Sequence, residues 1–275
     1  MLHVERRPDL RDPVMVVALT GWVDAGFAGA GAIAYLAEQM QQTARPFARL
    51  ELADLMDLQQ VRPTVRLVDG VSRAIDWPAI QFLAGSAGRD VVVCFGPEPS
   101  IRWRAVTEQI VGLARELRVS MAVMLGGIPA PVSHRRPVGV LATATRHSVL
   151  QEVGESRPDY AGPTGLQTVL QVALGEAGIP AVGLWAQVPH YVGTTASPAA
   201  VRALLERVRD IARVDVDLAP LDQQVDGYVA LLEQNLSERP DVAEIVRQLD
   251  AAQADQVPDG DQLVSEIERF LRDEQ

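Results

Sequence analysis

The sequence predicts an α/β protein: a three-layer αβα domain with a mixed sheet, followed by a C-terminal helical extension. Three observations lead to this prediction. From residue 14 to about 213, short apolar runs alternate with longer segments of helical periodicity. Several apolar runs are continuous, which is typical of strands that are covered on both faces. From Pro220 onward the pattern is helical only, and it is acidic.

The predicted sheet contains six apolar runs, at residues 14–19, 47–52, 91–95, 119–125, 138–144 and 181–188. A hairpin is expected between residues 65–68 and 71–75, because Asp69-Gly70 is a two-residue turn that β-hairpins favour. An antiparallel hairpin next to parallel strands would make the sheet mixed.

Helical periodicity falls between these runs, at residues 27–41, 101–117, 164–177 and 198–212. Thr164 with Gln167 three residues later forms a capping-box pattern. Ser197 followed by Pro198 predicts a serine N-cap and a proline in the first helical turn.

The C-terminal part is predicted to be a separate unit, which gives a core domain at 1–219 and an extension at 220–275. Amphipathic helices are expected there, with a last one beginning at Asp261. Each must cover its apolar stripe on the core, on its neighbours or on another subunit. The last of these options would make the protein a homo-oligomer.

Composition and charge narrow the classes of function. Of the net charge of −11, the segment 220–275 carries −10, with 14 acidic and 4 basic residues. An acidic chain argues against nucleic acid and anionic membranes as partners. No apolar run approaches the ~20 residues that cross a bilayer, and the start of the chain lacks the apolar core of a signal peptide. The single cysteine, Cys94, is expected in the core and fits a reducing, cytoplasmic location. All 25 basic residues are arginine, so no lysine side chain can form a Schiff base.

The stretch Gly21-Trp22-Val23-Asp24-Ala25-Gly26 lies where the first predicted strand ends and a helix begins. Asp24 can cap that helix. Alternatively, Asp24 beside an exposed Trp22 could hold a polar ligand or the backbone of a partner, because ligands bind at the carboxyl ends of strands in open α/β sheets. Gly26, Gly29 and Gly31 follow the order G-x-x-G-x-G, the reverse of the dinucleotide fingerprint, and are better explained by close helix–sheet packing.

Three further loops follow predicted strands or precede a helix. Gly162-Pro163-Thr164-Gly165 leads into a helix whose first amides could bind an anion, or it could be a turn with a threonine cap. Gly127 precedes Ser133-His134-Arg135-Arg136-Pro137, which could clamp an acidic group, although salt bridges to the acidic tail explain these arginines more simply. His190 lies past another strand end, and a lone histidine is more often structural than catalytic.

Familiar catalytic patterns are missing from the sequence. The four histidines have no metal-ligand spacing, Gly85-Ser86-Ala87-Gly88 is not a nucleophile elbow, and no phosphate-binding lysine loop is present. We therefore name no catalytic residue, no metal and no cofactor.

Several motifs occur in a familiar order, listed here: Gly21-Trp22-Val23-Asp24-Ala25-Gly26, Gly127-Ile128-Pro129, His134-Arg135-Arg136-Pro137, Tyr160-Ala161-Gly162-Pro163-Thr164-Gly165, Leu184-Trp185-Ala186-Gln187-Val188-Pro189-His190-Tyr191 and Glu266-Ile267-Glu268-Arg269-Phe270-Leu271-Arg272. Together they resemble the bacterial branch of the PAC2 family, the proteasome assembly chaperone 2-like proteins. The resemblance spans nearly the whole chain. It implies a phosphorylase-like αβα core with added C-terminal helices and a tendency to oligomerise.

The resemblance also suggests what the protein does. Eukaryotic and archaeal relatives escort proteasome subunits, so the first hypothesis is a non-enzymatic interaction or assembly-chaperone-like protein with proteasome-type subunits as partners. Family members that dock on proteasome rings end in a hydrophobic–tyrosine–any-residue tail, whereas this sequence reads Asp273-Glu274-Gln275, so docking by that route is not implied. The alternative is a small-molecule-binding protein or a hydrolase or phosphorylase-like enzyme, with a pocket where Asp24, Arg135, Arg136, Thr164 and His190 converge.

Overall fold

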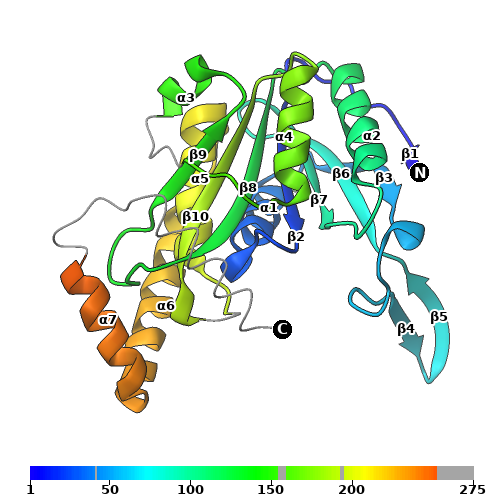
Figure 1. Ribbon diagram of the computed structural model, residues 1–275. Helices are drawn as coiled ribbons and strands as arrows, with labels where there is room; N and C mark the ends of the chain where they lie inside the picture. The colour runs from blue at the N-terminus through cyan, green and yellow to red at the C-terminus, as the bar shows by residue number, and fades with distance from the viewer. Residues whose placement is uncertain (41, 154–158, 193–194, 253–275) are drawn as a thin grey trace.

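The computed structural model describes residues 1–40, 42–153, 159–192 and 195–252 (Figure 1). Its centre is an eight-stranded sheet in the order β1-β3-β6-β7-β2-β8-β10-β9. The bounds are β1 Leu2–Val4, β2 Val14–Thr20, β3 Arg45–Glu51, β6 Ala79–Ser86, β7 Asp90–Pro97, β8 Met121–Ala130, β9 Val140–Ala144 and β10 Ala181–Pro189. A separate two-stranded sheet consists of β4 Thr64–Val68 and β5 Val71–Asp76.

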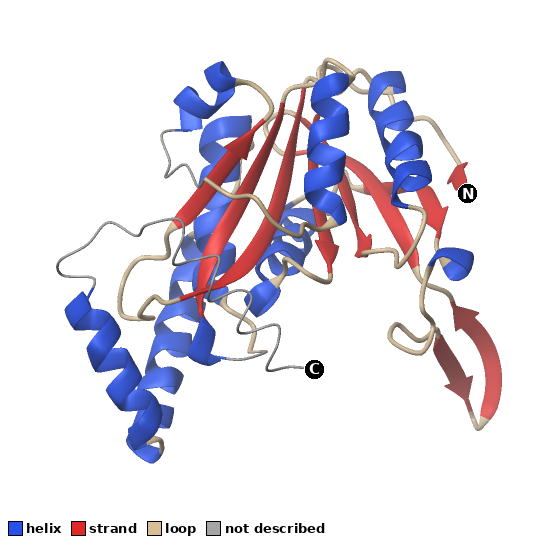
Figure 2. Ribbon diagram, viewed as in Figure 1, coloured by secondary structure: helices blue, strands red, loops and turns tan. Residues whose placement is uncertain are grey.

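The sheet is mixed, as predicted. The neighbouring strands β7, β2, β8 and β10 run parallel. The antiparallel members are β1, β3 and β6 on one side and β9 on the other. The predicted reason was wrong, because the Asp69-Gly70 hairpin pairs only with itself and stands apart from the large sheet (Figure 2). Both turn residues have positive φ, as a two-residue hairpin turn requires.

The helices are α1 Ala28–Gln39, α2 Trp103–Glu116, α3 His147–Val153, α4 Leu166–Glu176, α5 Pro198–Ala212, α6 Ala219–Glu238 and α7 Pro240–Ala252. Helices α1 and α5 pack on one face of the sheet, and α2 and α4 pack on the other (Figure 1). Strand β2 shows why its run is continuous: Val14, Val16 and Ala18 face the first layer, and Met15 and Val17 face the second. Burying every side chain of a strand requires both faces to be covered.

Some elements differ from the prediction. Strands β1 and β6 and helix α3 were not predicted. Ser197 caps α5 as predicted, with its Oγ accepting from the amide of Ala200. The capping box at Thr164 was wrong, because α4 begins at Leu166 and its N-cap residue is Gly165, which has no side chain to bond the first turn. Cys94 is fully buried, as expected, and burial raises the pKa of its thiol.

The extension begins as two helices. Helix α6 lays Leu221, Tyr228 and Leu232 on the core layer formed by α1 and α5, and α7 packs back on α6. The predicted last helix, from Asp261, lies outside the described residues. No helix in the described ranges is long and apolar enough to span a membrane.

Candidate functional site

Four parallel strands, β7, β2, β8 and β10, end at the same edge of the sheet, at Pro97, Thr20, Ala130 and Pro189. The loops that leave this edge contain the stretches singled out in the sequence. We call this region the strand-end rim and define it as residues 21–27, 98–102, 131–136, 160–165 and 190–192. Parallel strands in an α/β sheet gather their carboxyl ends in this way, and ligands commonly bind there.

The loop after β2 crosses the end of β8. The amide of Gly127 donates to the Val23 carbonyl oxygen at 2.9 Å, and Asp24 forms an isolated parallel bridge with Gly127. A Cβ at Gly127 would lie 2.2 Å from the Ala25 carbonyl oxygen, so the two backbones approach closely only because residue 127 is glycine. Gly26 has a positive φ of 61° and lies against Ser197, at the start of α5.

Asp24 points inward, toward the start of α1. Its Oδ1 accepts hydrogen bonds from the amides of Gly29, at 2.7 Å, and Ala30, at 3.3 Å. These bonds satisfy donors at the helix start, which is the capping role considered for this residue. Its Oδ2 is buried and has no hydrogen-bond partner among the described residues. Burial raises the pKa of Asp24 to about 6, and the two backbone hydrogen bonds partly oppose that rise.

The glycines that follow serve packing, as the sequence suggested. A Cβ at Gly29 would lie 2.5 Å from the Leu125 carbonyl oxygen of β8, and a Cβ at Gly31 would lie 2.6 Å from a methyl group of Val201 on α5. Helix α1 can therefore sit close to both the sheet and its neighbouring helix.

Glu98 was not predicted as a site residue, and its side chain lies at the start of α4. Its Oε1 accepts a short hydrogen bond from the amide of Leu166. Glycines on two other loops make room for it: a Cβ at Gly165 would lie 3.0 Å from Oε1, and a Cβ at Gly21 would lie 3.0 Å from Oε2. The anion expected at this helix start is thus a carboxylate of the chain itself. The only signal in the sequence was that Glu98 follows the predicted strand 91–95.

The residues that were expected to cap α4 have other positions. Thr164 and Gly162 are exposed in the loop before the helix. Gln167 is buried, and its side-chain amide lies 3.2 Å from the carbonyl oxygens of Val17 and Leu125, to which its nitrogen can donate.

His134 is a rim residue that faces the extension. Its Nδ1 lies 2.7 Å from the Tyr191 hydroxyl, and its Nε2 lies 3.0 Å from Oε1 of Glu233 on α6. Burial lowers the pKa of His134, while the contact with Glu233 opposes that change. A neutral ring that carries its proton on Nε2 satisfies both partners, because it donates to Glu233 and accepts from Tyr191.

Arg135 forms salt bridges with the acidic helices, which is the interpretation preferred from the sequence, whereas Arg136 makes a hydrogen bond to their backbone. Arg135 donates to both carboxylate oxygens of Glu233, at 2.6 and 2.8 Å, and to Oδ2 of Asp250 at 3.0 Å. The hydrogen bonds from Arg135 lower the pKa of Glu233 to about 2. Arg136 reaches the Asp250 backbone oxygen at 3.4 Å. The loop after β8 is therefore fastened to both α6 and α7.

His190 lies at the end of β10. Its Nδ1 lies 3.2 Å from the Ala130 carbonyl oxygen, a hydrogen bond that links the ends of two neighbouring strands. Its ring also packs edge-on against Tyr191, with 5.7 Å between ring centroids. These contacts match the structural role of a lone histidine.

The rim also exposes several large apolar side chains. Trp22 is 44% exposed and Phe27 is 48% exposed, the latter with a positive φ of 49°. Ile101 and Tyr160 are exposed on neighbouring loops. Large exposed apolar side chains gathered in one region mark contact surfaces.

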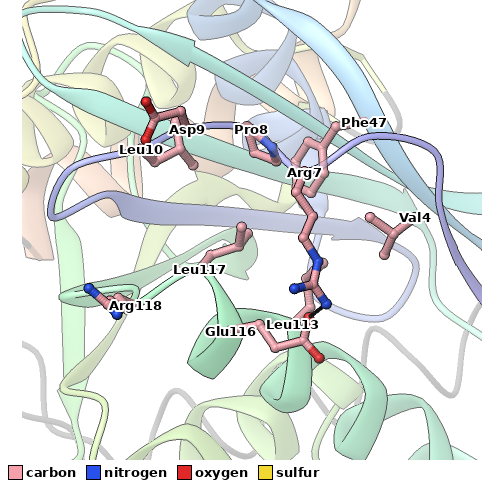
Figure 3. A pocket seen from close by; sticks show the side chains of 10 residues that line it. All are labelled: Val4, Arg7, Pro8, Asp9, Leu10, Phe47, Leu113, Glu116, Leu117 and Arg118. Atoms are coloured by element: carbon pink, nitrogen blue, oxygen red, sulfur yellow. Dashed lines mark hydrogen bonds and ion pairs between the residues drawn. The ribbon is translucent and has the colours of Figure 1, made fainter.

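One described cavity lies at a different place. It has a volume of about 260 Å³ and lies under the N-terminal segment, near the carboxyl end of α2 (Figure 3). Arg7 and Glu116 form an exposed ion pair of 2.8 Å in its wall. None of the site residues proposed from the sequence lines it. Within the described ranges, no group of three or more histidine, cysteine or acidic residues could hold a metal ion.

Several known proteins and one protein family are similar to this chain. Residues 18–235 match the sequence model of the PAC2 family. A proteasome-assembly chaperone homologue from Mycobacterium tuberculosis is 38% identical, with a TM-score of 0.78, and the match covers 85% of this chain and 99% of that one. A PAC2 family protein from Streptomyces avermitilis is also 38% identical, with a TM-score of 0.79 and coverage of 86% and 100%. An archaeal proteasome activator from Pyrococcus furiosus shares the fold at 20% identity, with a TM-score of 0.69 and coverage of 85% and 97%. Among curated proteins, none matches the chain.

Proposed function

The chain belongs to the PAC2 family, and on that basis we propose that it is a non-enzymatic, assembly-chaperone-like protein that binds proteasome-type subunits. The strand-end rim is its binding surface, and it acts in the cytoplasm. The names of its relatives support the class of partner: one is a proteasome-assembly chaperone homologue at 38% identity.

One observation carries this proposal: three polar side chains in or beside the rim bind helix starts within the chain, while two large aromatic side chains of the rim face outward. Asp24 bonds the start of α1, Glu98 bonds the start of α4, and Ser197 bonds the start of α5. Helix starts that could hold an anionic substrate are thereby occupied. Trp22 and Phe27 remain exposed, and tryptophan in particular contributes strongly to protein interfaces.

The experiment that tests this proposal is a binding assay with the whole chain. It is immobilised and incubated with unassembled proteasome α and β subunits from the same organism, beside an unrelated protein of matched net charge. We expect enrichment of the subunits, and at least a tenfold loss of binding in the Trp22→Ala/Phe27→Ala variant, since interface aromatics commonly contribute about 2 kcal/mol or more. Val172→Ala is the control, because Val172 is an exposed apolar side chain on α4 outside the rim. Enrichment no greater than that of the matched-charge protein would contradict the proposal.

A second candidate rests on Asp24. A buried carboxyl group with a pKa of about 6 and one unpartnered oxygen is the kind of group that binding and catalytic sites use. In a phosphorylase-like core, a purine nucleoside with inorganic phosphate is the first ligand pair to try. A rise in melting temperature or release of free base that Asp24→Asn abolishes would favour this function over the first.

A further inference from the structure

The hairpin of β4 and β5 projects from the body of the molecule (Figure 1). Its two ends connect β3 and β6, which are hydrogen-bonded neighbours in the sheet, and the backbone amide of Leu52 donates to the Pro78 carbonyl oxygen at its root. Because β6 begins opposite the carboxyl end of β7, the hairpin leaves the sheet at the same edge as the strand-end rim. All eleven residues of its two strands are exposed.

One face of this hairpin is apolar. Val65 pairs directly with Ile75, so these side chains share a face, and Leu67 lies two positions further along the same strand. The three side chains are 52%, 55% and 58% exposed. Trp77, also exposed, follows Ile75 at the next alternate position. A two-stranded hairpin is at best marginally stable in water, so this apolar face needs a cover.

The edges of the hairpin are less suited to pairing with another strand. Pro63 precedes β4, Arg66 lies within β4 beside its ion-pair partner Asp76, and Arg73 lies at a bulge. Proline, arginine and a bulge are the features that protect edge strands from strand addition. The hairpin is therefore built to make contact through its face.

The helical arm of α6 and α7 has the complementary properties. Residues 219–252 contain 7 acidic and 2 basic residues, whereas residues 62–76 of the hairpin contain 3 arginines and 2 aspartates. Leu231 and Glu238 share an exposed face of α6, and Ile245 is exposed on α7. In the described part of the chain, Glu238 has no ion-pair partner, and neither has Arg73.

The two arms lie at opposite sides of the sheet (Figure 1). The hairpin is rooted in β3 and β6, whereas the helical arm is fastened by Arg135 to the loop after β8. Strands β7 and β2 lie between these roots, so the arms of one chain are separated. A hairpin could therefore cover a helical arm only in another copy.

We propose that the apolar face of the hairpin in one copy packs on the exposed face of α6 and α7 in a second copy. Pairing between the apolar faces of two hairpins would instead join two copies of the same surface. A contact between two different surfaces is heterologous, so repetition closes a ring or extends a chain of copies. This proposal does not rest on the proposed partner subunits, and its test measures self-assembly alone.

Engineered cysteines test the contact, because Cys94 is the only native cysteine and it is buried. Ser72→Cys places a thiol opposite Leu67 on the hairpin, and Asn235→Cys places one beside Leu231 on α6. Under oxidising conditions, a mixture of the two single variants should form a disulfide-linked heterodimer. Ser72→Cys mixed with Val172→Cys on α4 is the control and should not. Cross-linking mainly between two Ser72→Cys chains, or none in the mixture, would overturn the proposal.

A second measurement tests the same contact without relying on disulfide formation. Light scattering after size exclusion should show an oligomer, and Leu67→Ser/Ile75→Ser should raise its dissociation constant at least tenfold. Ala74→Ser, on the opposite face of the hairpin, is the control and should leave assembly intact. Circular dichroism should show all three chains equally folded. A wild-type chain that is monomeric at micromolar concentration, or a double variant that assembles normally, would refute the contact.

Discussion

Asp24→Asn tests how the burial of one carboxyl group shapes the strand-end rim. The pKa of Asp24 rises from 3.8 to about 6, because burial disfavours the charged form. The protonated form is therefore favoured by folding. Its contribution to stability is fully present below pH 3.8 and is lost as the pH rises through 6. At 1.36 kcal/mol for each pKa unit, the total is about 3 kcal/mol.

The change to asparagine keeps an oxygen that can accept from the amides of Gly29 and Ala30, and it removes the charge. At pH 8 the variant avoids the buried charge, but it buries an NH₂ group that can cost about 1–3 kcal/mol if unpaired. The decisive quantity is therefore the pH dependence. Between pH 5 and 8 the wild type should lose about 1.4 kcal/mol through Asp24, and the variant should not.

Urea denaturation followed by tryptophan fluorescence at pH 5 and pH 8 measures this difference. Asp226→Asn, which removes an exposed carboxylate on α6, controls for the change in net charge. If the difference in unfolding free energy between Asp24→Asn and wild type is equal at both pH values, within about 0.5 kcal/mol, the raised pKa is refuted.

Three further predictions concern stability. Gly127→Ala should destabilise the fold by about 3 kcal/mol or more, since its Cβ would lie 2.2 Å from a backbone oxygen. Gly227→Ala on α6 has open space around the new methyl group and should stabilise the fold by about 0.5–1 kcal/mol. The midpoints of urea unfolding measure both effects. Glu233→Gln should destabilise the chain near pH 7, although only modestly because Glu233 is 40% exposed. The difference from wild type should fade as the pH falls from 4.5 toward 2, because Arg135 lowers the pKa of Glu233. Unchanged stability at pH 7 would count against a stabilising bond between Arg135 and Glu233. Ser197→Ala should lower the melting temperature through about 1 kcal/mol of lost helix capping, while Ser197→Gly should cost less.

The parallel strands could be predicted from the sequence because their physical cause is local. Strands β2, β7, β8 and β10 are covered on both faces, so each appears as a continuous apolar run. The hairpin turn could also be predicted from the sequence, since Asp69 and Gly70 readily take the positive φ angles seen in the structure. Strand β6 was missed because Gln81 and Gly85 interrupt its apolar pattern, and β1 because three residues carry too little periodicity.

The rim was predicted as a region, but its bonds were not. The cap of α4 was predicted among the adjacent residues, whereas the carboxylate that binds Leu166 is Glu98, 68 residues earlier. Such a contact depends on where β7 ends in the folded chain. For Arg135, charge composition correctly indicated the acidic tail as partner, but only the packing of α6 and α7 selects Glu233 and Asp250.

The way the hairpin joins the sheet has a consequence for how the protein can vary. Residues 53–77 connect two strands that are hydrogen-bonded to each other, and Leu52 and Pro78 close the base of this connection. Its first part is held to the body, because the Leu55 carbonyl oxygen accepts from the amides of Ser100 and Ile101, whereas β4 and β5 pair only with each other. The hairpin is therefore a modular insertion, which can change its length or its surface without altering the strand order beneath it. Protein variants with shortened or exchanged β4–β5 hairpins should keep the αβα body, so the surface that this arm presents can evolve, or be engineered, separately from folding.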